Sequence, residues 1–189
     1  PLVDAYNRSI TYLRISITDR CNLRCTYCMP EEGIDWKPRE SILRYEEILR
    51  IVSVAIRRGL KKVRVTGGEP LVRRGVIEFI QALHQLPGLS DLALTTNGVF
   101  LKEAAADLYR AGLNRINISL DSLHPQTFAQ IVRRDIFDRV WEGIETCERI
   151  GFHPIKINCV LQAGINDHEV IDFARLTQRK PYHVRFIEY

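Results

Sequence analysis

The segment Arg14–Pro30 reads RISITDRCNLRCTYCMP and joins an alternating strand to a group of cysteines. At its start, Ile15 and Ile17 alternate with polar neighbours, so this strand has one apolar and one polar face. Three cysteines then fall within eight residues: Cys21, Cys25 and Cys28. The segment therefore predicts a half-buried strand that leads directly into a loop with metal or redox chemistry.

The pattern of the first strand returns along the chain. We expect strands near residues 11–18, 62–66, 91–96, 115–120, 155–161 and 183–188, with helices between them near 44–58, 73–86, 101–111, 136–150 and 167–179. Gly59, Gly112 and Gly151 each follow a helical pattern and are predicted to end it. Strands that alternate with helices predict βα units and a parallel sheet in one domain, residues 1–189.

The polar face of each predicted strand narrows the fold class. A parallel sheet with helices on both sides reads as continuous apolar runs, whereas these strands alternate. We therefore expect helices on the apolar face only, and a concave polar face on the other side. This predicts an α/β barrel or half-barrel with a wet interior, unlike the filled interior of a closed eight-stranded barrel.

Four basic residues share the predicted interior face: Arg14, Lys62, Arg64 and Lys156. Because cations around an empty cavity are costly, an anionic ligand would complement them. The alternative is that they extend to solvent or pair with Asp121 and Glu69. Asn97 and Asn117 point into the same interior and are given no specific role.

The three clustered cysteines can hold three irons of one cubane and leave the fourth iron open, because no fourth cysteine lies nearby. An open metal position is where small molecules react. The alternatives are structural zinc, an electron-transfer cluster that borrows a distant ligand, and free thiols. Cys147 and Cys159 lie in apolar patterns and are expected to be buried structural residues.

A second motif, Thr66-Gly67-Gly68-Glu69-Pro70, ends the second strand. Two glycines let the backbone approach a ligand closely, and Glu69 offers an acceptor, although such a turn alone is only weakly specific. The chain thus carries this glycine motif and also Cys-x-x-x-Cys-x-x-Cys, with Tyr27 before the last cysteine. With both motifs, it resembles the radical S-adenosylmethionine (SAM) superfamily. That resemblance implies a [4Fe–4S] cluster whose open iron binds SAM and whose electron releases a 5′-deoxyadenosyl radical.

A longer series of motifs narrows the resemblance. RVTGGEPLVRR, LTTNG, RINISLDS, KINCV, GIND and RFIEY follow the first segment in order, over nearly the whole chain. The series resembles the GTP 3′,8-cyclase family of molybdenum cofactor biosynthesis. This implies an incomplete (β/α)6 TIM-like barrel, truncated after the sixth strand. It also implies hydrogen removal from C3′ of GTP, which leads to 3′,8-cyclo-7,8-dihydro-GTP.

The same resemblance implies roles for individual residues. The cluster ligands would be Cys21, Cys25 and Cys28. The contacts to SAM would be Tyr27, Gly68 and Ser119, with Gly67 and Glu69 in the same turn. The GTP contacts would be Arg14, Arg64, Thr95 and Lys156, with Lys62 and Arg185 added from parity and charge. No acid or base is implied, because radical abstraction needs positioning and exclusion of water. The implied partners are an external one-electron reductant and a downstream enzyme of the molybdopterin pathway.

Composition excludes several other classes of protein. A net charge of +4 with dispersed basic residues argues against nucleic-acid binding. No apolar run reaches 18 residues, and the first residues carry no secretory pattern, so we expect no membrane partner and a cytoplasmic location. The family resembled continues beyond this length with a second cysteine triplet. We therefore expect a fragment that binds SAM but turns over GTP poorly or not at all.

Overall fold

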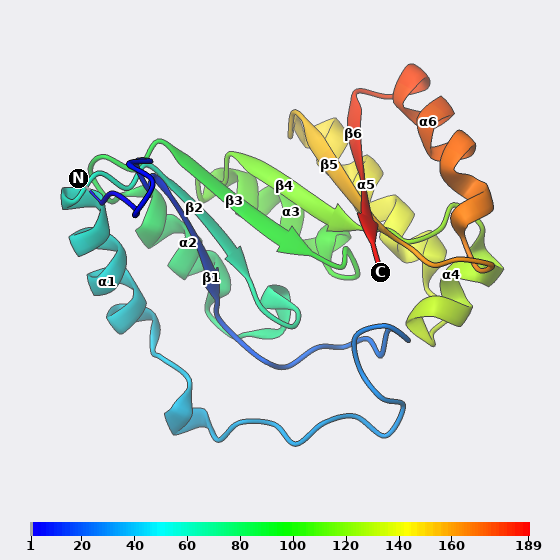
Figure 1. Cartoon of the computed structure of the whole chain (residues 1–189), viewed down its shortest axis with the longest axis horizontal. Coiled ribbons are helices and arrows are strands. Elements are labelled where there is room, and N and C mark those ends of the chain that lie inside the picture. Colours follow the sequence, from blue (N-terminus) through cyan, green and yellow to red (C-terminus); the bar gives the residue numbers. More distant parts are fainter. Residues whose placement is uncertain (1) are drawn as a thin grey trace.

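Six parallel strands form one open sheet in sequence order, β1-β2-β3-β4-β5-β6 (Figure 1). The computed structural model describes residues 2–189, so Pro1, the first residue of the predicted domain, lies outside them. The strands are β1 (Tyr12–Ser16), β2 (Lys62–Thr66), β3 (Asp91–Thr96), β4 (Arg115–Ser119), β5 (Ile155–Leu161) and β6 (Tyr182–Glu188). All five pairings are parallel, as the alternation of strands and helices predicts.

The helices that cross between the strands are α1 (Tyr45–Arg57), α2 (Val76–His84), α3 (Leu101–Arg110), α4 (Pro125–Val132), α5 (Phe137–Ile150) and α6 (Val170–Arg179). Short 3-10 turns η1 (Arg39–Ser41), η2 (Pro70–Val72) and η3 (Asp167–Glu169) precede α1, α2 and α6. Five helices match the predicted ones, and the predicted stops Gly59, Gly112 and Gly151 all have positive φ. A Cβ at Gly112 would also lie 2.3 Å from the His84 ring.

Sequence patterns missed α4. It has only eight residues and begins with Pro125 at a favourable first-turn position. It ends at Arg133, which takes the left-handed conformation with φ 57° and ψ 32° that a glycine usually supplies. The sequence has no glycine at this position to mark the end of a helix. The segment therefore could not be distinguished from a long loop by its sequence.

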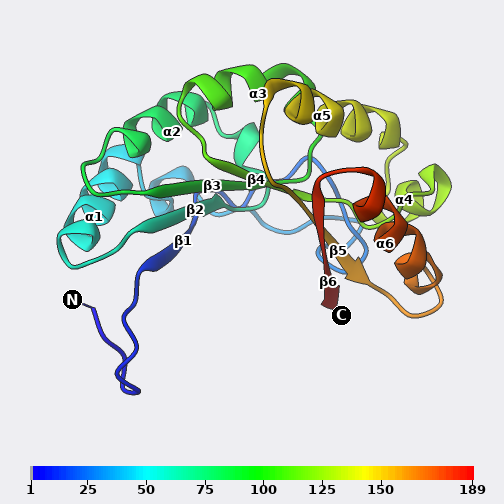
Figure 2. The same ribbon diagram turned by 90° about the horizontal axis from the view of Figure 1, so that it is seen from above.

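The sheet is covered on one face only. In Figure 2, α1, α2, α3 and α5 form an arc over that face, and the opposite face is left concave. The strand residues beneath the helices are fully buried, with exposed fractions of 0–1% for Val63, Val65, Leu94, Ile116 and Ile118. Burial of this apolar stripe drives the curvature, and the polar residues of each strand remain on the open side. The incomplete barrel with a polar interior is confirmed.

No helix among residues 2–189 has both the length and the apolar character that a membrane crossing requires.

Candidate functional site

The three clustered cysteines lie on one loop at the carboxyl edge of the sheet. The loop that carries them leaves β1, passes below the ends of the strands toward α4, and returns to α1 (Figure 1). The amide groups of Cys28 and Met29 both donate to the carbonyl of Cys25, at 2.9 and 3.0 Å. Cys28 is exposed, and Cys21 and Cys25 are half-buried. Cys25 and Cys28 therefore share one tight turn, and Cys21 precedes it in the same loop, at the edge where such barrels carry their active sites.

The thiols affect one another's ionisation. Burial raises the pKa of Cys25 to about 12, and the charges of Asp121, Cys21 and Cys28 add to this. Burial also raises the pKa of Cys21, while the Leu23 amide, 3.4 Å from its sulfur, acts in the opposite direction. A bound cation reverses this balance, because coordination stabilises the thiolate. The turn is therefore suited to cationic metal centres.

The three sulfurs are not placed as ligands of one zinc ion. A Zn–S bond of about 2.3 Å holds the sulfurs of one zinc ion roughly 3.8 Å apart. Among the described residues, the one group of three possible ligands within 4.8 Å of one another does not include the cysteines. In a cubane each thiolate binds a different iron, so its sulfurs stand further apart. The donors present, three thiols on one loop, fit the [4Fe–4S] group that the motif implies.

Helix α4 supports the cysteine turn. The Thr26 amide donates to the carbonyl of Ile131 at 2.9 Å. The Arg133 guanidinium donates to the carbonyls of Arg24 and Met29, at 3.2 and 3.1 Å. Arg133 is thus both the strained residue that ends α4 and the side chain that spans the turn. Sequence reasoning missed this role, and a pair of arginines after an unrecognised helix gives no signal for it.

Tyr27 fixes the turn from the other side. Its hydroxyl donates to Asp121 Oδ2 at 2.8 Å, and the Val160 amide donates to Asp121 Oδ1 at 2.9 Å. Asp121 is 3% exposed, and burial raises its pKa. Burial, followed by the nearby Asp121 charge, also raises the pKa of Tyr27. The carboxylate therefore connects the cysteine turn to the ends of β4 and β5.

Removal of the Tyr27 hydroxyl should weaken the chain. The change Tyr27→Phe leaves a buried carboxylate oxygen without its donor, which costs about 1–3 kcal/mol of unfolding free energy. We expect lower stability by urea unfolding together with weaker SAM binding. Tyr45→Phe is the matched control, because the Tyr45 hydroxyl is buried without a partner among residues 2–189. Equal stability losses in the two variants would contradict the role given to the Tyr27–Asp121 bond.

The glycine turn after β2 packs against the loop that leads to the cysteines. The Gly68 amide donates to the Thr18 carbonyl at 2.7 Å, and the Glu69 amide to the Arg20 carbonyl at 2.8 Å. A Cβ at Gly68 would lie 2.3 Å from the Arg20 oxygen, and one at Gly67 would lie 2.6 Å from the Thr18 oxygen. The two glycines are therefore required for close contact with the chain's own backbone, and their approach to a ligand stays a prediction.

The expectation that Glu69 offers a free acceptor needs correction. Its side chain is fully buried, and both oxygens accept hydrogen bonds within the protein. Oε1 accepts from the Leu71 amide at 3.0 Å and from Thr96 Oγ1 at 2.8 Å, and Oε2 accepts from the Asn97 amide at 2.6 Å. Glu69 thus fastens the turn to the end of β3 and does not face an open site.

Basic side chains converge on the concave face. Burial lowers the pKa of Arg64, and the charges of Arg14, Arg185 and Arg115 lower it further. Burial likewise lowers the pKa of Lys156, together with Arg185, Arg115 and Arg64. Sequence reasoning left out Arg115, although it shares the strand parity of Asn117 and Ser119. These shifts place five cations within electrostatic reach of one another.

Most of these cations have no counter-charge from the chain. Arg115 pairs with Asp91. Within residues 2–189, Arg14, Arg64, Lys156 and Arg185 make no salt bridge. The alternative pairing with Asp121 and Glu69 is wrong, because those carboxylates accept the amide and hydroxyl hydrogen bonds described above. The face therefore offers concentrated positive charge to an anion.

Strand register places the remaining predicted residues. Thr95 lies beside Asn117, and Asn117 beside Lys156, in one row across the sheet. Ser119 is one row nearer the cysteine edge, in register with Asn158 and then Arg185. In the described part of the chain, Asn117 Oδ1 and Arg64 Nε are buried without a hydrogen-bond partner. Buried polar atoms of this kind are normally hydrogen-bonded, so a ligand or water in the concave interior would supply their partners.

Two predicted interior residues differ from the rest. Lys62 lies in the row nearest the start of the strands, in register with Tyr12 and Asp91. The side-chain amide nitrogen of Asn97, Nδ2, donates to Asn22 Oδ1 at 2.8 Å, so this side chain connects the end of β3 to the cysteine loop. Cys147 and Cys159 are fully buried, as expected.

Comparison with known proteins agrees with this geometry. Residues 15–177 match the family model described as the radical SAM superfamily. The chain is 56% identical over 188 residues to a GTP 3′,8-cyclase of Petrotoga mobilis, and 52% identical over 187 residues to one of Desulforamulus reducens. The two matches include 100% and 99% of this chain but only 58% of each relative. The chain therefore spans little more than half the length of these relatives.

The fold is also shared with solved structures. The protein anSMEcpe with bound AdoMet superposes with a TM-score of 0.71 at 20% identity, over 94% of this chain and 49% of that one. At this level of identity the likeness shows a common architecture and nothing about substrate.

Proposed function

The chain belongs to the radical SAM superfamily, and from that premise we propose that it forms the SAM-binding part of a GTP 3′,8-cyclase of molybdenum cofactor biosynthesis. The observation that carries the proposal is the group of cations without counter-charge on the concave face below the cysteine turn. A triphosphate supplies the negative charge that this face lacks. The names of the relatives at 50–56% identity support the same substrate.

We assign the cofactors to the carboxyl edge of the barrel. Cys21, Cys25 and Cys28 would hold the [4Fe–4S] cluster, with Tyr27, Gly67, Gly68 and Ser119 around SAM. When bound, the cluster supplies the electron that cleaves SAM and yields the 5′-deoxyadenosyl radical. Asp121 and Glu69 would orient this edge indirectly, through the Tyr27 hydroxyl and the end of β3.

We assign GTP to the interior. Arg14, Arg64, Lys156 and Arg185 would bind its phosphates, and Thr95 would contact it in the adjoining row. Lys62, two residues before Arg64 on the same face of β2, would add a further contact to the phosphates. The chain's task is to hold C3′ of GTP near the SAM site and to exclude water. An external one-electron reductant and a downstream molybdopterin enzyme complete the proposed pathway. Five free cysteines suit a reducing compartment, and we propose the cytoplasm.

Anaerobic reduction in the presence of SAM tests this proposal. A radical enzyme releases 5′-deoxyadenosine, whereas an electron-transfer protein releases none. Equilibrium dialysis with GTP then separates the cyclase from a radical SAM enzyme that acts on peptides. We expect both 5′-deoxyadenosine and GTP binding, with little or no cyclic product from these 189 residues alone. Failure to bind GTP would contradict the assigned substrate, and cyclic product at the rate of a full-length relative would contradict the expectation for this length.

A further inference from the structure

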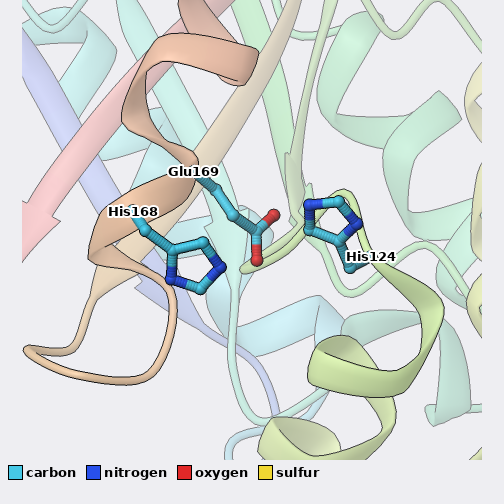
Figure 3. Close-up of side chains that lie close together, drawn as sticks. All are labelled: His124, His168 and Glu169. Carbon is cyan, nitrogen blue, oxygen red and sulfur yellow. The ribbon is translucent and has the colours of Figure 1, made fainter.

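A second group of possible metal ligands lies apart from the cysteine turn. Figure 3 shows the carboxylate of Glu169 between the imidazole rings of His124 and His168. One ligand atom from each residue lies within 4.8 Å of the other two. His124 is the residue that precedes α4, and His168 and Glu169 belong to η3, which leads into α6. The group thus joins two segments that are more than forty residues apart in the sequence.

Glu169 is a buried carboxylate without a cationic partner. Its side chain has no exposed surface. Oε1 accepts from Ser122 Oγ at 2.7 Å and Oε2 from the Leu123 amide at 2.6 Å, and both donors are neutral. Throughout residues 2–189, no Lys, Arg or His nitrogen lies within 4.0 Å of its oxygens. Buried carboxylates are normally paired with a cationic side chain or coordinated to a metal ion. Among the described residues, Glu169 has no cationic side chain as a partner.

The two histidines are placed to supply the rest of a metal site. Both are exposed, and their rings stack at 18° with centroids 6.4 Å apart. Neither imidazole makes a hydrogen bond to another described residue. A zinc ion at about 2.0–2.2 Å from each ligand holds tetrahedral ligand atoms roughly 3.3–3.6 Å apart. Rotation of the two exposed rings about their side-chain bonds can close this difference, which is at most about 1.5 Å.

We propose that His124, His168 and Glu169 bind one divalent zinc-class ion, with water in the remaining position. Two imidazoles and one carboxylate form a donor set that suits such ions and excludes calcium and magnesium, which prefer oxygen. The ion would neutralise the buried carboxylate and cross-link the start of α4 to the start of α6. The far end of α4 carries the hydrogen bonds to the cysteine turn, so the site would brace that support. It uses none of the residues assigned to SAM or GTP.

Zinc titration against a chromophoric chelator tests the site. In a chain with Cys21, Cys25 and Cys28 all changed to Ala, thiolates of the loop cannot compete. We expect one Zn²⁺ per chain, and binding at least about tenfold weaker in His124→Ala and in His168→Ala. Zinc at a hundredfold excess over its dissociation constant should raise the melting temperature by about 5–10 °C. His84→Ala, at the exposed end of α2, is the matched control and should bind as the parent does.

Cobalt absorption in the same chain, with Cys21, Cys25 and Cys28 changed to Ala, gives a second readout. Co²⁺ at the proposed site shows visible bands without the intense near-ultraviolet absorption of sulfur coordination, and these bands should vanish in His168→Ala. Zinc binding that is unchanged in both histidine variants would overturn the proposal. Cobalt bands that persist in His168→Ala, or that carry sulfur absorption, would also overturn it.

Discussion

We expect replacement of Cys25 by alanine to remove the proposed iron–sulfur cluster and to reduce the release of 5′-deoxyadenosine to the background level. Two thiolates cannot hold a cubane that three protein ligands share with one open iron. Cys25 is the middle one of the three proposed ligands, and its carbonyl accepts hydrogen bonds from the amides of both Cys28 and Met29. The backbone of the turn survives the change, so the loss should be chemical. Iron and sulfide content, the visible spectrum and 5′-deoxyadenosine, all measured anaerobically, check this.

Cys147→Ala is the matched control. Cys147 is fully buried in α5, and burial raises its pKa to about 12, so it is an inert thiol of the core. Its loss should cost about 1 kcal/mol of stability and leave iron content unchanged. Retention of iron and of 5′-deoxyadenosine release in Cys25→Ala would show that the cluster has other ligands. Equal loss in Cys147→Ala would show that the effect comes from folding.

The second large effect is expected at Arg64. Removal of one guanidinium that binds a phosphate costs about 1.5–3 kcal/mol, so Arg64→Ala should weaken GTP binding roughly 10- to 150-fold. The GTP affinity of Arg64→Lys should lie between those of the parent and of Arg64→Ala. Lysine keeps the positive charge but loses the paired N–H donors of the guanidinium. Equilibrium dialysis with GTP at fixed ionic strength gives the affinities. SAM cleavage without GTP should stay close to the parent value.

The stability of the Arg64 variant separates binding from structure. Arg64 has no carboxylate partner in residues 2–189, and its charged form is disfavoured by burial and by Arg14, Arg115 and Arg185. Arg64→Ala should therefore unfold at the same urea concentration as the parent or at a higher one. Lys61→Ala, an exposed lysine outside β2, is the control for general charge loss. A destabilised Arg64→Ala, or an equal loss of GTP binding in Lys61→Ala, would contradict the assigned role.

Strand parity explains why much of the architecture could be predicted from the sequence. The alternation in β2 and β4 fixes which residues face the helices, so Val63 and Ile116 belong to the core and Arg64 and Asn117 to the interior. Parallel pairing in sequence order then brings these polar faces into one concave surface. Parity is a local property of the backbone, and it survives folding whatever the tertiary contacts are.

Tertiary contacts explain what could not be predicted. The buried position of Glu69 depends on Thr96 and Asn97, nearly thirty residues away, and sequence cannot show that these use its oxygens. Helix α4 ends on a strained Arg133 that only its bonds to the cysteine turn justify. The histidines beside Glu169 come together through the path of two loops. Parity could have identified Arg115, which the strand pattern places beside the other cations.

The central claim is that three thiolates hold a cluster whose open iron binds SAM. Electron–nuclear double resonance of the anaerobically reduced protein, with ¹⁵N in the amino group of SAM, tests it most directly. We expect a hyperfine coupling from the labelled nitrogen to the cluster in the parent chain and in Cys147→Ala. A reduced cluster that shows no such coupling while SAM is bound would mean that no iron is open to the cofactor, and the claim would be wrong.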